Sequence, residues 1–176
     1  MERTYVMVKP DGVKRGLVGD IVSRFERAGL TIENMSVFHA TEERINNHYP
    51  SHDGWFNAVG TKTKEAYERD GLDIVETFGS ADPVTIGKVV KSWLAEYMTS
   101  GPVVGMILKG NRAISIVRKL VGHTFPSEAA PGTIRGDYSI DSPDLANVEK
   151  RSIKNLVHAS GDPEEAANEI QLWFGE

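Results

Sequence analysis

The residues with the clearest chemical potential are one histidine and a set of cationic and hydroxyl side chains at the ends of predicted elements. His158 lies within residues 155–162 (NLVHASGD), between an apolar, strand-like segment and the start of a helix. The cationic and hydroxyl candidates are Lys9, Arg118, Thr124 and Arg135. Guanidinium groups match the geometry of phosphate oxygens, so these residues could form an anion site. A lone histidine at such a position is more often structural, and only the accompanying cations make His158 a candidate for catalysis.

The composition limits the chemistry that the chain can perform. The 176 residues include no Cys, which removes thiolate nucleophiles, redox pairs and zinc sites built on sulfur. The formal net charge of -5 argues against general affinity for nucleic acid, because such binding requires an excess of Lys and Arg facing phosphates. Any anion site in this chain must therefore be a local cluster of cations.

Length and hydropathy indicate a single soluble domain. A chain of 176 residues can bury enough apolar surface to fold without disulfides or a structural metal. No apolar run approaches the roughly 18–20 residues that span a bilayer, and the first residues lack the layout of a signal peptide. We therefore expect a cytoplasmic protein with neither a membrane nor a specific nucleic-acid partner.

Hydrophobic periodicity predicts alternating strands and helices that would position the candidate residues. The predicted strands cover residues 4–8, 30–40 and 103–108, and the predicted helices cover residues 18–28, 42–48, 84–98, 111–121 and 164–173. Residues 9–12 (KPDG) are typical of a turn, and residues 123–145 show little apolar periodicity. This order favours one α/β layered domain, but it does not distinguish a parallel sheet from a split βαβ sandwich with an antiparallel sheet.

Several segments resemble the nucleoside diphosphate kinase family, and they come in the family's order. The matching segments are residues 8–13 (VKPDGV), 15–19 (RGLVG), 48–49 (HY), 100–104 (SGPVV), 118–126 (RKLVGHTFP), 130–137 (APGTIRGD) and the segment around His158. The resemblance implies an α/β fold of the α+β sandwich type. Its core would be ferredoxin-like βαββαβ, with an antiparallel four-stranded sheet and flanking helices, in a single domain over residues 1–176.

The resemblance also implies a phosphotransferase that works in two steps. The γ-phosphate of a nucleoside triphosphate passes to a histidine and then to a nucleoside diphosphate, which maintains nucleotide pools. His158 would be the nucleophile and Glu169 would accept a hydrogen bond from its other ring nitrogen, with Ser160 and Tyr49 completing the catalytic group. A nucleophilic imidazole must be neutral and held in one tautomer, and a nearby carboxylate can satisfy both needs.

Further residues match the family's nucleotide contacts. Arg118, Arg135 and Thr124 would neutralise phosphate oxygens, and Lys9 and Asn155 would reach the phosphoryl region and the sugar hydroxyls. Phosphoryl transfer depends on positioning and charge stabilisation, which a ring of fixed cations supplies. Mg²⁺ would be bound through the nucleotide phosphates, with no side chain as a direct ligand. The family also implies a homo-oligomer, either a hexamer or a tetramer.

The chain departs from the family pattern next to the predicted nucleophile. Ala159 stands where the family usually has Gly, and Gly161 stands where it typically has Asp. Asp162 follows and could either cap the next helix or replace the missing carboxylate.

Two insertions are predicted, at about residues 57–83 and 141–151. The family holds an aromatic residue against the nucleobase soon after the matched tyrosine, and the candidates here are Phe56 and Trp55. We expect a helix at about residues 61–69 to fold back near the base site, and the helix over residues 84–98 to pack on the sheet.

A second interpretation remains possible at this level. The same fold could serve as a non-catalytic, nucleotide-binding regulatory module, because a fold does not determine a function. Formation of an acid-labile phosphoprotein distinguishes the two interpretations.

Overall fold

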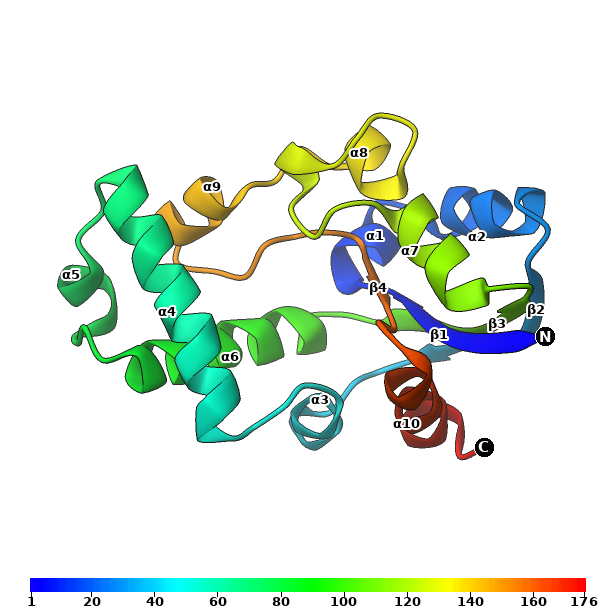
Figure 1. Ribbon diagram of the computed structural model, residues 1–176, viewed down its shortest axis with the longest axis horizontal. Helices are drawn as coiled ribbons and strands as arrows, with labels where there is room; N and C mark the ends of the chain where they lie inside the picture. Colours follow the sequence, from blue (N-terminus) through cyan, green and yellow to red (C-terminus); the bar gives the residue numbers. More distant parts are fainter.

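The computed structural model describes residues 1–176 and contains one antiparallel sheet with helices on both faces (Figure 1). The strands are β1 (Glu2–Val8), β2 (Thr31–Phe38), β3 (Val103–Gly110) and β4 (Val157–Ala159). Their order is β2-β3-β1-β4, and each neighbouring pair is antiparallel. The structure therefore confirms the ferredoxin-like sheet and excludes the parallel arrangement that periodicity alone left open.

The helices include several that periodicity did not predict. The observed helices are α1 (Pro10–Lys14), α2 (Val18–Arg27), α3 (Glu42–His48), α4 (Asp53–Asp70), α5 (Ile74–Phe78), α6 (Pro83–Thr99), α7 (Ala113–Val121), α8 (Ile134–Tyr138), α9 (Pro143–Val148) and α10 (Pro163–Phe174), with a 3₁₀ turn, η1 (Pro126–Glu128). The predicted turn after β1 is instead the start of α1, because Pro10 suits the first turn of a helix. The elements η1, α8 and α9 are too short to produce a visible apolar period.

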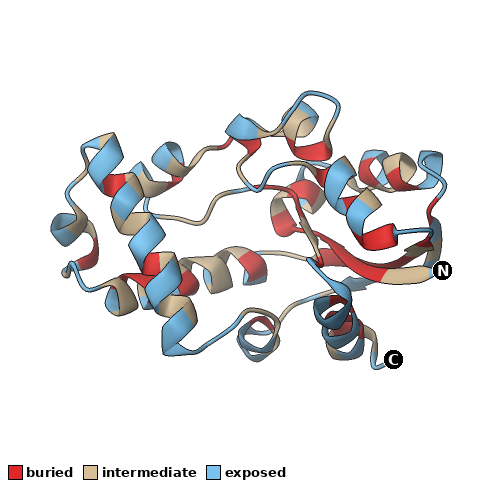
Figure 2. Ribbon diagram, viewed as in Figure 1, coloured by how far each residue is buried: buried red, intermediate tan, exposed pale blue.

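The sheet separates two apolar layers. Side chains alternate across a strand, so Val6 and Val8 face α2 and α7, whereas Tyr5 and Met7 face α3 and α10. Phe25 of α2 packs in the first layer, with Val6 and Val8. These three side chains are buried, as are those of Tyr5 and Met7 on the other face (Figure 2). Because β1 is covered on both faces, it forms a rigid base for β4, which pairs with it.

A third, smaller core holds α4, α5 and α6 together, away from most of the sheet (Figure 1). Tyr67, Phe78 and Ile86 form its buried centre. Glycines allow α4 and α6 to approach closely, since a Cβ atom at Gly60 would lie 1.8 Å from the Pro83 carbonyl oxygen.

This small core corrects two expectations for the first predicted insertion. The helix expected at about residues 61–69 is longer than predicted, because α4 covers Asp53–Asp70. The helix expected to pack on the sheet, α6, packs mainly on α4, and only its C-terminal end, near Met98, joins the core beneath the sheet. The apolar face of α6 has a second helix to cover it, which periodicity cannot reveal.

None of the helices combines the length and the apolar character that a membrane-spanning segment requires.

Candidate active site

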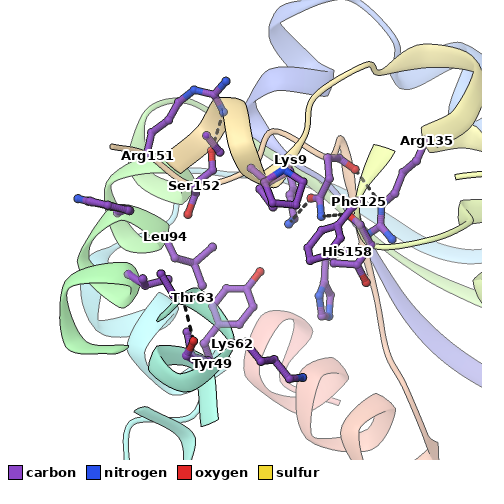
Figure 3. Close-up of a pocket in the computed structure, with 18 of the residues that line it drawn as sticks. Lys9, Tyr49, Lys62, Thr63, Leu94, Phe125, Arg135, Arg151, Ser152 and His158 are labelled. Atoms are coloured by element: carbon purple, nitrogen blue, oxygen red, sulfur yellow. Dashed lines mark hydrogen bonds between the residues drawn. The ribbon is translucent and has the colours of Figure 1, made fainter. Parts of the chain in front are cut away.

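A cavity of about 500 Å³ lies between the sheet and the helices α4, α6 and α9 (Figure 3). Seven of the residues predicted from the sequence line it: Lys9, Tyr49, Arg118, Thr124, Arg135, Asn155 and His158. Its lining includes five cationic side chains, Lys9, Lys62, Arg118, Arg135 and Arg151, and a single carboxylate, that of Glu165. The cavity is thus strongly cationic in a protein whose formal net charge is -5, as the local-cluster argument requires.

The hydrogen bonding of His158 leaves one ring nitrogen free. His158 lies on β4, opposite Met7 of β1, and its Nε2–H donates to Oε1 of Glu169 at 2.6 Å. Burial lowers the pKa of His158 to about 3, and the charge of Lys9 is the next cause. The imidazole is therefore neutral at pH 7, and Nδ1 keeps the free lone pair that a nucleophile requires.

Glu169 and Ser160 lie behind His158 and do not line the cavity. Glu169 is buried on α10, and its Oε2 accepts a hydrogen bond from Oγ of Ser160 at 2.6 Å. Burial raises the pKa of the Glu169 carboxyl above its ordinary value. Ser160 was expected in the catalytic group, and the structure places its hydroxyl against the Glu169 carboxylate and the Tyr5 backbone rather than in the cavity.

Asp162 caps the helix that carries Glu169. Its Oδ1 accepts a hydrogen bond from the backbone N–H of Glu165 at 2.9 Å, which satisfies one of the free donors at the start of α10. The carboxyl of Glu165 in turn accepts the backbone N–H of Gly161. Of the two roles left open by the sequence, helix capping is the one that the structure shows for Asp162.

Lys9 and Asn155 form a polar bridge at the inner end of the cavity. Nζ of Lys9 donates to Oδ1 of Asn155 at 2.7 Å, and Nδ2 of Asn155 donates to the carbonyl oxygen of Thr124 at 2.9 Å. Burial, together with the charge of Arg135, lowers the pKa of Lys9 to about 7. Lys9 is thus a preformed cation whose charge depends on pH near neutrality.

The two arginines differ in their surroundings. The buried guanidinium of Arg135 donates to the carbonyl oxygens of Asn155 (3.0 Å), Gly122 (3.1 Å), His123 (3.2 Å) and Val157 (2.6 Å). Arg118 is exposed, with Nη1 3.7 Å from the position that a Cβ atom on Gly161 would take. Arg135 therefore uses most of its five donors to hold the loops of the site together, whereas Arg118 keeps its donors for a ligand.

Tyr49 presents a hydroxyl group to the cavity. The Tyr49 Oη atom is buried without a hydrogen-bond partner, and the ring lies edge-on to that of His158 at 6.0 Å between centroids. Burial raises the pKa of this hydroxyl well above its usual range, so it stays a donor. Lys91 of α6 holds the loop by donating to the Tyr49 carbonyl oxygen at 2.8 Å.

Neither candidate for the base-stacking aromatic lines the cavity. The Phe56 ring lies against Trp55, with 5.7 Å between centroids, and 5.8 Å from Nζ of Lys88 on α6. The reason is the close crossing of α4 and α6, where a Cβ atom at Gly87 would lie 2.1 Å from the Phe56 carbonyl oxygen. Phe125 and Trp93 are aromatic residues of the cavity lining that the sequence argument did not select, and the only available signal was the place of Phe125 next to Thr124.

The far wall of the cavity comes from both predicted insertions. Its polar residues are Lys62 and Thr63 on α4, Asn147 on α9, and Arg151 and Ser152 after α9 (Figure 3). The two helices of this wall, α4 and α9, are joined by a hydrogen bond from Oη of Tyr67 to the carbonyl oxygen of Asn147 at 3.1 Å. No sequence motif pointed to these residues, because their proximity to His158 depends on how α4 and α9 pack.

Comparisons with known proteins point to one family. A family model described as nucleoside diphosphate kinase matches residues 2–61 and 85–176. A nucleoside diphosphate kinase of Pyrobaculum aerophilum is 54% identical over 176 residues, which cover 100% of this chain and 96% of the relative. One from Archaeoglobus fulgidus is 42% identical over 176 residues, covering 100% of this chain and 88% of the relative.

Solved structures show the same similarity. The crystal structure of an NDP kinase from Pyrobaculum aerophilum has a TM-score of 0.95 at 54% identity and covers 98% of this chain and 95% of its own. A transition-state mimic of the nucleoside-diphosphate kinase from Borrelia burgdorferi, with bound vanadate and ADP, has a TM-score of 0.75 at 36% identity, covering 98% and 86% of the two chains.

A ferredoxin-like sheet that presents a neutral histidine to a cationic cavity defines a class of phosphoryl-transfer enzymes. Within that class the chain belongs to the nucleoside diphosphate kinase family. It is an enzyme that moves the γ-phosphate of a nucleoside triphosphate to a nucleoside diphosphate. The non-catalytic regulatory module is not favoured.

Proposed function

We propose that Nδ1 of His158 is the atom that carries the phosphoryl group between the two nucleotides. In the first step its lone pair forms a bond to the γ-phosphorus, and the bond to the bridging oxygen of the leaving nucleoside diphosphate breaks. In the second step a terminal oxygen of the acceptor diphosphate attacks the same phosphorus, and the bond to Nδ1 breaks. The observation that carries this proposal is the 2.6 Å hydrogen bond from Nε2 to Glu169, which leaves Nδ1 as the only nucleophilic ring atom.

The neighbouring residues have distinct roles in this proposal. Arg118 and Lys9 neutralise charge on the transferring group, and Tyr49 donates its unpaired hydroxyl to a phosphate oxygen. Asn155 and Thr124 bind the nucleotide beside them. Arg135 acts mainly by fixing the backbone on which these groups sit, since four carbonyl oxygens take its hydrogen bonds.

Mg²⁺ fits the reaction as an ion bound by the nucleotide phosphates rather than by protein side chains. The cavity lining supplies one carboxylate, whereas a Mg²⁺ site built from protein side chains requires more oxygen ligands. When bound to the phosphates, Mg²⁺ would screen their charge and orient them.

We further propose a homo-oligomer, hexameric or tetrameric, that acts in the cytoplasm, where its nucleotide substrates are produced and consumed. The proposed single domain carries the insertion at about residues 57–83, an interpretation supported by the unmatched residues 62–84 of the family comparison. The second proposed insertion, at residues 141–151, falls within the matched range. Mass measurement in solution tests the assembly, and cell fractionation tests the location.

The decisive experiment uses the variant His158→Ala. Incubation with γ-labelled ATP and Mg²⁺ should give acid-labile phosphate on the wild-type protein and none on the variant, with nucleotide exchange abolished and the fold retained. His39→Ala is the matched control, because His39 is exposed and lies outside the cavity. Exchange by His158→Ala at a rate close to that of the wild type would contradict the proposal.

A further inference from the structure

A strained turn stands immediately before the histidine strand. Leu156 is fully buried and has a φ of 67°, although it is not a glycine. The backbone N–H of Val157 donates to the carbonyl oxygen of Asn155 at 2.7 Å, which closes a three-residue turn centred on Leu156. This is the rare γ-turn with positive φ, which persists only where surrounding contacts enforce it.

The turn determines where two residues of the site point. Asn155 enters it and His158 follows one residue after it, and both side chains reach the cavity. Arg135 holds its two ends through the carbonyl oxygens of Asn155 and Val157. Relaxation of Leu156 to a negative φ would therefore redirect the chain that carries His158.

The segment after β1 holds Leu156, the central residue of the turn, by two hydrogen bonds. The backbone N–H of Lys9 donates to the Leu156 carbonyl oxygen at 2.8 Å, and the Leu156 N–H donates to Oδ2 of Asp11 at 3.2 Å. Gly12 permits this approach, because a Cβ atom there would lie 3.1 Å from the Leu156 carbonyl oxygen. Both backbone polar groups of the strained residue are therefore satisfied by α1 and the residue that precedes it.

A side chain from α6 completes the arrangement. Oη of Tyr97 donates to Oδ1 of Asp11 at 2.6 Å, so one carboxylate bridges Tyr97 and the Leu156 backbone. Trp93 and Leu94, on the same helix, line the cavity. The helix that forms a wall of the site is thus connected to the turn before the histidine through one partly buried carboxylate, that of Asp11.

We propose that Asp11 and Tyr97 are positioning residues for phosphoryl transfer. Tyr97 orients the Asp11 carboxylate, the carboxylate holds Leu156 in its strained conformation, and the turn presents His158 and Asn155 to the nucleotide. This inference rests on the proposed role of His158. Neither Asp11 nor Tyr97 lines the cavity, so their hydrogen bonds act on the reaction through the backbone of the turn. Both also lie near Lys9: the centroid of the Tyr97 ring is 5.6 Å from its Nζ, and the charge of Asp11 partly offsets the lowering of its pKa.

The test compares Tyr97→Phe and Asp11→Asn with the wild type. Rapid quench with γ-labelled ATP and Mg²⁺ gives the rate of His158 phosphorylation, and calorimetric titration with ADP gives nucleotide affinity. We expect each variant to phosphorylate at least about tenfold more slowly, a change of about 1.4 kcal/mol, with affinity retained. The double variant should be no slower than Asp11→Asn alone, because both changes release the same turn.

The control is Tyr138→Phe, which removes a tyrosine hydroxyl that accepts a hydrogen bond from Arg24 at 3.3 Å outside the cavity. Its phosphorylation rate should match that of the wild type. Tyr97→Phe decides the question if Asp11→Asn does not fold. A normal phosphorylation rate in Tyr97→Phe, or equal losses in the control, overturns the inference. Absence of phosphorylation in the wild type would instead refute the proposed function.

Discussion

Replacement of Glu169 by Gln isolates the contribution of one buried charge to the reactivity of His158. The amide has nearly the same size as the carboxylate and can still accept the Nε2–H at the 2.6 Å position, while its NH₂ group faces Oγ of Ser160. The hydrogen bonds therefore survive, but the negative charge beside the imidazole is lost. That charge matters most when His158 carries the phosphoryl group, because the ring then bears positive charge with Nε2 protonated.

The size of the effect follows from the hydrogen bond. A hydrogen bond to a charged partner contributes about 1.5–3 kcal/mol, and one between neutral groups about 0.5–1.5 kcal/mol. The difference of roughly 1–2 kcal/mol corresponds to a phosphorylation rate about 5- to 30-fold lower in the variant. Nucleotide affinity should change little, because Glu169 does not line the cavity.

The free energy of unfolding of Glu169→Gln should not fall together with its phosphorylation rate. Burial raises the pKa of Glu169, so the folded wild type binds this proton more readily than the unfolded chain does. The resulting stability is fully present below the unfolded pKa of about 4.3 and is lost as pH rises through the higher folded pKa. Glu169→Gln has no carboxyl to ionise, so it does not lose this stability as pH rises. At pH 8 it should be at least as stable as the wild type, and the difference in stability between the two proteins should shrink towards pH 4.

The assay combines rapid-quench phosphorylation with thermal unfolding at pH 5 and pH 8. Glu164→Gln serves as the control, because Glu164 is exposed on the same helix and outside the cavity. A phosphorylation rate in Glu169→Gln equal to that of the wild type would refute the role assigned to the carboxylate. A slower variant with lower stability at pH 8 would show that the hydrogen bonds, rather than the charge, dominate.

Four further predictions follow from the contacts of the cationic residues and of α4. Arg118→Ala should lower turnover at least about tenfold without lowering the melting temperature, because its exposed guanidinium holds no other group; unimpaired turnover would place the phosphate elsewhere. Arg135→Ala should lower both turnover and melting temperature, since it removes the guanidinium hydrogen bonds to four carbonyl oxygens of the surrounding loops, and a fully stable variant would contradict this. The kcat/KM of the free enzyme should fall as pH rises through about 7, where the pKa of Lys9 lies and its cation loses a proton; a profile flat to pH 9 would exclude a role for that charge. Deletion of residues 61–80 with a short Gly/Ser bridge should change the Michaelis constants more than the transfer rate, since α4 contributes to the far wall, and unchanged constants would assign the segment to stability or assembly.

The local sequence predicted the strands and part of the chemistry, but not whether the sheet is parallel or antiparallel. Apolar strands flanked by turn residues placed β1 and β3 close to their observed bounds, since a central strand covered on both faces must be apolar throughout. Residue types at the ends of predicted elements pointed to Lys9 and His158, and the resemblance to the family added Asn155; the structure brings all three to one cavity. These features were accessible because each depends on residue types within a few positions of one another.

Only the tertiary structure decided what each selected residue touches. Phe56 turned away from the cavity because the α4 and α6 backbones meet at glycines, and Ser160 lies behind Glu169. The donors of Arg135 went to backbone carbonyls, and the strained turn at Leu156 needed Asp11, far away in the sequence, to hold it. Such outcomes depend on contacts between distant segments, whose distances and directions arise only when the helices pack on the sheet.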